Sequence, residues 1–411
     1  MTAMALGSSP ATPVARLRQA LFEAAGLLGL FATFSFPLLA FALSVALLLN
    51  LPAHTAAVHR RLLTLVAIVS VCLLISSRAN TTEGSDDLIG YYDLYLEFHS
   101  GDLERFAQFG SGLELVPTSL LWLWATVLPT LTPNGLMLCL ASTSALLFWF
   151  WLETTFFKHG DENSRGDMAL IGVALLLFNL YFSTQLARQF LSLVVLLYAF
   201  TARTPLRRAL FVTLAASCHL TALPVYAAYL LVRRGKNGVL LLLAGALLLR
   251  LYFGQVLSML DVLPQALIEK LVYYVDSTSE YSAADLGALK LVGLLCAVSL
   301  AAAIGSGFRL ARGWPRLNLD PATRPWHVAP WATLIVFIVL LPIPLASLRS
   351  TLLVHSIAAG VIAFHCFGRK QRPLLVALFN VFLINKLASL AMLSHDGALP
   401  TTFALLTNVF E

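Results

Sequence analysis

Two arginines interrupt long apolar runs of the sequence, and each stands at the start of a segment that can form a helix. Arg188 lies in LYFSTQLARQFLSLVVLLYAF, followed by Gln189, and Arg349 lies in LLPIPLASLRSTLLVHSIAAG. A guanidinium at hydrocarbon depth costs at least ~2.5 kcal/mol, so it marks a functional site by default. It also stays charged and offers a planar fork of donors that matches phosphate. Arg188, Gln189 and Arg349 therefore predict a site for an anionic, lipid-like molecule; the alternative is a pair of interfacial arginines that reach lipid headgroups.

An acidic turn rich in tyrosine follows the second apolar run. Its sequence, GSDDLIGYY, contains Asp86, Asp87, Tyr91 and Tyr92. A carboxylate here could act as a base or orient a sugar hydroxyl, and the two together could hold magnesium or manganese. The alternative is a solvated turn in which Asp86 or Asp87 caps a surface helix. We expect both tyrosines to bind substrate.

A histidine and a later tyrosine complete the set of candidate site residues. His219 lies in the middle of LFVTLAASCHLTALPVYAAYLL, where Thr221 could hydrogen-bond it as an ordinary core residue. A neutral histidine beside a phosphate or hydroxyl could instead exchange a proton near pH 7. Tyr274, in KLVYY, could stack on a sugar, although tyrosines also form the usual aromatic belt of membrane proteins.

The composition indicates that these residues belong to a membrane protein. Of the 411 residues, 59% are hydrophobic and 12% are charged, about half of the ~25% charged residues in soluble domains. The fold class is therefore an all-α polytopic integral membrane protein with about 11–13 transmembrane helices, counted as apolar windows of about 20 residues. These windows are 27–51, 62–78, 115–132, 135–157, 168–184, 187–202, 208–232, 238–254, 286–305, 328–347, 350–367 and 373–393.

Charge sets the expected orientation and domain organisation. The basic residues behind the net charge of +6 cluster in short loops between apolar runs. This is the pattern of cytoplasmic loops and not of a nucleic-acid-binding protein. We expect residues 1–20 to form a disordered or interfacial tail and 21–411 a single transmembrane domain. The polar segments 79–114 and 255–285 are expected to be helical periplasmic loops.

One apolar run, 208–232, is expected to be broken or re-entrant. Basic clusters flank it at both ends, and Pro224 follows His219 closely. Irregular backbone at membrane depth is tolerated where it lines a cavity and not lipid. We therefore expect His219 to face such a cavity.

The order of these features resembles the EpsG-like branch of the Wzy polysaccharide polymerases over roughly residues 60–393. The positions that carry the resemblance are Asp87, Arg188, His219, Tyr274 and Arg349. It implies a fold similar to the GT-C class of glycosyltransferases, in the bacterial inner membrane, with the active site facing the periplasm. It also implies transfer of a growing O-antigen or exopolysaccharide chain from undecaprenyl diphosphate to the non-reducing end of a lipid-linked repeat unit.

The resemblance assigns roles and partners as well. Arg188 and Arg349 would meet the charge of the departing diphosphate without a metal or other cofactor, and His219 or Asp87 would be the base. The partners would be undecaprenyl-diphosphate-linked oligosaccharides, the lipid bilayer, a chain-length regulator and a flippase, with no nucleic acid.

Three other functions fit parts of the sequence. A lipid-linked oligosaccharide flippase would bind the same diphosphate, but the chain lacks the two-fold repeat of many transporters. An O-antigen ligase would be expected to carry a large outer domain. A metal-dependent transferase would use Asp86 and Asp87.

The expected topology places segments 79–114 and 255–285 on the same, periplasmic side. Cysteines introduced at Ser85 and Ser277 should therefore both react with a membrane-impermeant thiol reagent in intact spheroplasts. Labelling of one position and protection of the other would contradict both the topology and a shared site.

Overall fold

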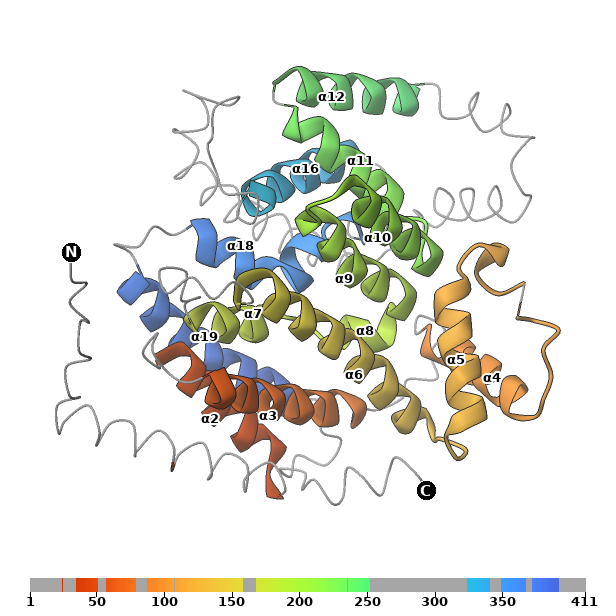
Figure 1. The fold of residues 1–411 in the computed structure, drawn as a ribbon, viewed down its shortest axis with the longest axis vertical. Coiled ribbons are helices and arrows are strands. Elements are labelled where there is room, and N and C mark those ends of the chain that lie inside the picture. Colours follow the sequence, from red (N-terminus) through yellow and green to blue (C-terminus); the bar gives the residue numbers. More distant parts are fainter. Residues whose placement is uncertain are drawn as a thin grey trace, which may run out of the picture.

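The computed structural model describes most of the chain, and the elements that it describes are all helices (Figure 1). The prediction of an all-α protein is therefore confirmed for this part of the chain. The described residues are 24, 35–50, 57–78, 87–106, 108–157, 168–234, 236–251, 324–340, 349–366 and 372–391. The predicted tail 1–20, segment 255–285 and apolar window 286–305 lie outside these ranges.

The α-helices are α2 (Pro37–Asn50), α3 (Ala57–Ser76), α4 (Leu88–His99), α5 (Leu115–Val127), α6 (Pro133–Leu152), α7 (Met168–Leu177), α8 (Tyr181–Gln185), α9 (Ala187–Thr201), α10 (Pro205–Cys218), α11 (Ala222–Arg233), α12 (Lys236–Leu251), α16 (Arg324–Leu340), α18 (Ala359–Cys366) and α19 (Arg372–Ala391). A 3₁₀ turn, η1 (Phe109–Gly112), precedes α5, and π-helical turns form η2 (Glu153–Phe157) and η5 (Leu353–Ile357).

Two helical stretches of the described residues, α3 and Pro133–Phe157, are long and apolar enough to cross a membrane. Several predicted windows form shorter helices instead. The window 168–184 is split because the N–H of Asn179 donates to the carbonyl oxygen of Ser356 at 2.7 Å, and α8 begins only at Tyr181. A long-range hydrogen bond thus replaces the next helical one.

Threonine–proline pairs fix where two helices of the site region begin. Thr132 caps α6 by accepting from the N–H of Gly135 at 3.1 Å, and Thr204 caps α10 in the same way from Arg207 at 3.3 Å. The following proline suits the first helical position because its fixed φ is helical and no N–H is needed there.

The apolar run 208–232 is broken at the histidine, as expected. Helix α10 ends at Cys218, and His219 is extended, with φ −163° and ψ 131°. Helix α11 then begins at Ala222, with Pro224 in its first turn, where proline is tolerated.

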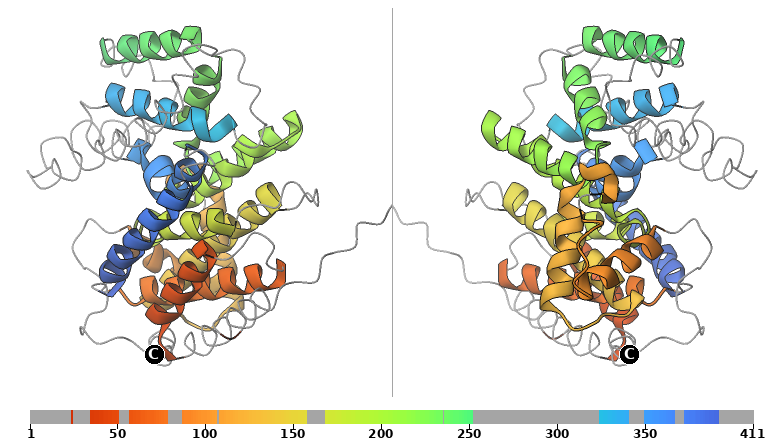
Figure 2. Two further views of the ribbon diagram at one scale, coloured as in Figure 1. Left: turned by 90° about the vertical axis from the view of Figure 1, so that its left-hand side faces the viewer. Right: turned by 90° about the vertical axis from the view of Figure 1, so that its right-hand side faces the viewer.

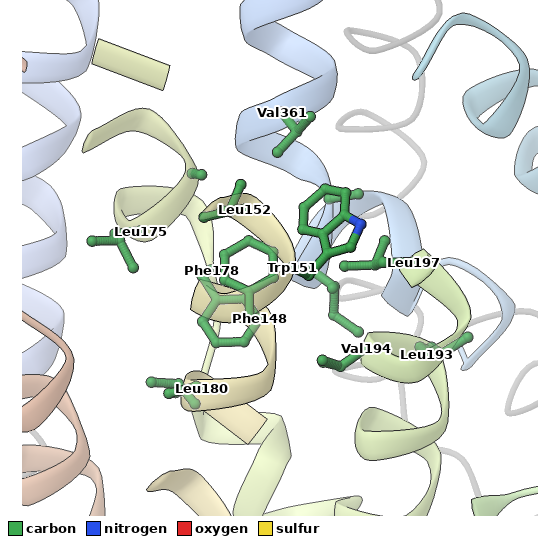
Figure 3. Packing of buried hydrophobic residues seen from close by; sticks show 14 of the residues in the cluster. Phe148, Trp151, Leu152, Leu175, Phe178, Leu180, Leu193, Val194, Leu197 and Val361 are labelled. Carbon is green, nitrogen blue, oxygen red and sulfur yellow. The ribbon is translucent and has the colours of Figure 1, made fainter. Parts of the chain in front are cut away.

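The main core joins α6 to α7 and α9 through large aromatic side chains (Figure 3). The rings of Phe148 and Phe178 stack with centroids 4.1 Å apart, and Trp151 meets Trp326 edge-on at 5.2 Å. The indole N–H of Trp151 donates to Thr201 at 3.1 Å. Such aromatic pairs contribute about 0.5–1.5 kcal/mol each beyond area burial, so this core holds α9 firmly.

A second, smaller core holds α4 against α5 at one edge of the bundle (Figures 1 and 2). The hydroxyl of Tyr95 accepts from the N–H of Leu131 at 3.0 Å and donates to the carbonyl oxygen of Pro129 at 3.1 Å. These bonds fix α4 on the turn between α5 and α6. The predicted outer segment 79–114 therefore contains a helix, as expected.

Glycine permits a very close approach of α18 to α7. A Cβ atom added at Gly360 would lie 2.4 Å from the carbonyl oxygen of Val173 and 2.5 Å from the Cα of Ala174. Backbone atoms cannot move aside as a flexible side chain can. Any larger residue at this position must push the two helices apart.

Gly360→Ala should therefore destabilise the protein, whereas Gly245→Ala should not, because a Cβ at Gly245 meets nothing within 4 Å. Overpacking of this kind costs ~1–3 kcal/mol. Thermal unfolding of both variants in the same detergent measures the difference. Equal melting temperatures would contradict the close contact of α7 with α18.

Candidate functional site

A buried carboxylate brings two of the predicted site residues together. The Nη1 atom of Arg188 lies 2.5 Å from Oε2 of Glu114, and the Nε2 atom of His219 lies 3.7 Å from Oε1. Glu114 is fully buried, while the side chain of Arg188 is 19% exposed. We call Glu114, Arg188, His219 and Tyr91 the Glu114 centre.

Tyr91 is the residue of this centre that comes from α4. Its hydroxyl oxygen accepts from Nε of Arg188 at 3.2 Å, and the guanidinium lies 5.0 Å from the ring centroid of Phe109. Burial raises the pKa of the Tyr91 phenol, and the charge of Arg188 opposes that rise only in part. The phenol is therefore neutral and acts as an acceptor that orients the guanidinium.

His219 is held in one tautomer by the residue two positions after it. The backbone N–H of Thr221 donates to Nδ1 at 3.2 Å, and the Thr221 hydroxyl lies 2.9 Å from the same atom. Because a backbone N–H can only donate, Nδ1 is an acceptor, and the proton of the neutral ring is on Nε2. That N–H is on the side of the ring that faces Glu114. At 3.7 Å the contact is electrostatic and not a direct hydrogen bond.

Ser192 links α9 to the break between α10 and α11. Its hydroxyl lies 2.7 Å from the carbonyl oxygen of Ala215 and 3.1 Å from that of His219. Each carbonyl oxygen also accepts a backbone N–H, that of Ala215 from His219 at 3.0 Å and that of His219 from Ala222 at 3.1 Å. The Ser192 hydroxyl adds a contact from α9 to the end of α10 and so helps to fix the direction in which His219 leaves the helix.

Asp87 lies close enough to act on the centre. It occupies the N-cap position of α4, but its side chain makes no capping hydrogen bond. Its negative charge contributes to the raised pKa of Tyr91. The carboxylate is therefore not used as a helix cap. Asp86 lies outside the described residues, as does Tyr274.

Arg349, the second predicted arginine, contacts the first turn of α9 through its backbone carbonyl group. The side-chain amide of Gln189 donates to the carbonyl oxygen of Arg349 at 3.1 Å, and Gln189 is almost fully buried. Adjacent residues of α9 thus contact Glu114 and Arg349. Tyr92 faces the turn between α5 and α6 instead, where its hydroxyl donates to the carbonyl oxygen of Leu131 at 3.1 Å.

Sequence reasoning did not identify Glu114 or the buried Arg78 as site residues. Nε of Arg78 donates to Thr184 at 3.0 Å, and its guanidinium lies 5.4 Å from the ring centroid of Tyr181. Both residues stand at the end of an apolar window, Arg78 after the second run and Glu114 before the third. An ionisable residue in that position is the same signal that identified Arg188.

No group of three or more metal-ligating side chains gathers within the ranges that the structure describes. The centre instead contains one carboxylate, one guanidinium and one imidazole. Such a set can bind an anion at the guanidinium and move a proton at the imidazole or a carboxylate.

The model of the EpsG family matches residues 61–403, which include every candidate site residue from Asp86 to Arg349. The chain belongs to the EpsG family. This is a family of exopolysaccharide, Wzy-like polymerases, so the chain is a glycosyltransferase-like polymerase of the membrane. No curated protein and no solved structure matches the chain.

Glu114→Gln should destabilise the protein strongly, because it leaves Arg188 partly buried without its counter-ion. Breaking a buried ion pair costs ~3–5 kcal/mol. The matched control is Glu97→Gln, which removes an exposed ion pair with Arg105 that is worth ~0–1 kcal/mol. Thermal unfolding of both variants measures the two costs. A Glu114 variant as stable as the Glu97 variant would show that the buried pair does not hold the centre together.

Proposed function

We propose that this protein polymerises a surface polysaccharide by transferring the growing glycan from undecaprenyl diphosphate to the non-reducing end of an undecaprenyl-diphosphate-linked repeat unit. The single observation that carries this proposal is the fixed guanidinium of Arg188 in a chain of the EpsG family. A preorganised cation is what the departure of a lipid diphosphate requires.

The reaction exchanges one C–O bond for another. The acceptor hydroxyl oxygen attacks the anomeric carbon of the donor glycan, and the bond from that carbon to the diphosphate oxygen breaks. The diphosphate leaves with the bonding electrons, and the hydroxyl proton passes to a base. Negative charge therefore develops on the diphosphate, and charge-assisted hydrogen bonds from arginine are strongest there.

Arg188 retains donors for this purpose. Its Nε donates to Tyr91 and its Nη1 to Glu114, which leaves the Nη2 donors without a hydrogen-bond partner among the described residues. The guanidinium is thus held from one side and presents its other side to a ligand. Locking the fork before the ligand arrives reduces the entropy lost on binding.

A second cation is needed because Glu114 already neutralises Arg188. The two side chains together carry no net charge, whereas a diphosphate carries at least one negative charge. Arg349 can supply the missing charge, since Gln189 joins its backbone to the turn that holds Arg188. We therefore assign the diphosphate to both arginines.

Asp87 is the better of the two candidate bases. In His219, Nδ1 accepts from Thr221 and Nε2 carries the proton, so the ring in this state is a donor toward Glu114. The Asp87 carboxylate is not engaged in capping α4 and acts electrostatically on Tyr91. His219 then positions the Glu114 carboxylate.

The side of the membrane on which the site lies follows from the segment that contains its residues. Asp87, Tyr91 and Glu114 all belong to the segment 79–114, which the charge pattern places outside the cytoplasm. The site would therefore face the periplasm of a multi-pass inner-membrane protein. A flippase would deliver the repeat units to this side, and a chain-length regulator would act on the product there.

Arg188→Lys should lower the rate of polymerisation by about 10²–10³-fold, because lysine keeps the charge but loses the bidentate fork. The matched control is Arg207→Lys, an exposed position on α10 that should leave the rate unchanged. Purified protein in proteoliposomes, supplied with lipid-linked repeat units, gives the rate from the length distribution of the product.

The same variant in cells separates a polymerase from a flippase. A failing polymerase leaves single repeat units exposed on the periplasmic side, whereas a failing flippase leaves them on the cytoplasmic side. Long polymer in Arg188→Lys cells would show that the arginine is only an interfacial anchor.

A further inference from the structure

Helix α8 is the short turn of helix that leads into the first arginine of the site. It packs against α6 and α9 (Figure 1). Leu186 follows it in a backbone conformation that is not helical, with φ −123° and ψ 48°. The N–H of Leu186 donates to the carbonyl oxygen of Phe182 in α8 at 2.8 Å, and its carbonyl oxygen accepts from Phe190 in α9 at 2.8 Å. The placement of α8 therefore sets the direction in which α9 starts.

The start of α9 is an unfavourable place for the cation of Arg188. Leu186 is the N-cap, so Arg188 is the second residue of the helix, where the positive end of the helix dipole opposes a guanidinium. Tyr91 and Glu114 hold the guanidinium from the side of α4 and α5. These contacts also require that α9 begin at a fixed place. Helix α8 has only five residues and cannot fix that place alone, since isolated helices shorter than ~12–15 residues are marginal in water.

Arg78, two residues after the end of α3, holds α8 from another side. Its side chain is buried, and its Nε donates to the hydroxyl oxygen of Thr184 at 3.0 Å. The Thr184 hydroxyl donates its own proton to the carbonyl oxygen of Tyr181 at 2.9 Å, so its oxygen is free to accept from the arginine. The guanidinium also lies 5.4 Å from the ring centroid of Tyr181. One buried cation thus contacts the first and fourth residues of α8.

We propose that Arg78 is a positioning residue of the site. By fixing α8 it places the start of α9 so that the guanidinium of Arg188 meets Glu114 and the donor diphosphate. Arg78 acts through α8 and is not assigned a contact with substrate. Its effect on the rate of polymerisation rests on the proposed function, whereas its effect on the pair of Arg188 with Glu114 does not.

Removing the acceptor on α8 tests this role while Arg78 stays in place. Thr184→Val keeps the shape of the side chain but cannot accept from Nε. It should lower the rate of polymerisation by about 10–10²-fold, since a displacement of about 1 Å far from the chemistry can cost 10²-fold. Thr184→Ser keeps the hydroxyl and should retain the rate. The matched control is Thr64→Val on α3, a buried threonine whose hydroxyl donates only to the carbonyl oxygen of Arg60, at 2.8 Å.

The same change in an Arg188→Lys background shows whether Arg78 acts through Arg188. The fork that α8 positions is then already lost, so Thr184→Val should lower the remaining rate by no more than about twofold. A variant that only weakened the fold would lose the same factor in both backgrounds, and that result would overturn the proposal. So would a Thr184→Val protein that polymerises as fast as the wild type.

Thermal unfolding gives a second readout that needs no polymerase activity. Glu114→Gln should lower the melting temperature less in the Thr184→Val background than in the wild type, because the ion pair that it breaks is already weakened. An equal decrease in both would overturn the positioning role even if polymerisation were intact. A smaller decrease in a protein without polymerase activity would support the positioning role and contradict the proposed function. If Thr184→Val does not yield folded protein, Thr184→Ala replaces it, with Thr64→Ala as its control.

Discussion

The buried carboxylate of Glu114 is the charge on which the arrangement of the site depends. A guanidinium removed from water without a counter-ion is costly, and Glu114 offers one oxygen to Arg188 and the other toward His219. It thereby joins three segments that are far apart in sequence. It also cancels the charge of Arg188, so anion binding at the centre requires a second cation. In the proposed function, Arg349 supplies this second charge.

Residues in the first two turns of α9 contact the other segments that form the site. Arg188 reaches Tyr91 and Glu114 on the α4–α5 side, and Gln189 bonds the backbone of Arg349. Ser192, one turn further on, holds the carbonyl oxygen of His219 at the break between α10 and α11. Each residue contacts a different segment, so small displacements of α9 would alter all three contacts together. The aromatic core around Phe148 and Trp151 keeps α9 in place.

The sequence could predict the features of the site that depend only on neighbouring residues. An arginine inside an apolar run, or a proline shortly after a histidine, is visible within a few residues, and this gave Arg188 and the break at His219. Glu114 stands next to an apolar window, but its role could not be predicted locally, because it comes from a partner 74 residues away. The split of window 168–184 has the same cause, since it depends on a hydrogen bond from Asn179 to Ser356. Hydropathy alone describes residues 168–184 as one continuous helix.

The central claim is that Arg188, held by Glu114, binds the diphosphate of a lipid-linked donor. A cryo-electron microscopy structure with undecaprenyl diphosphate bound would test it most directly. The account predicts phosphate oxygens within hydrogen-bond distance of the Arg188 guanidinium and of Arg349, with the Arg188–Glu114 contact intact. A diphosphate bound away from Arg188, or an Arg188 that remains enclosed by protein with the donor present, would contradict it.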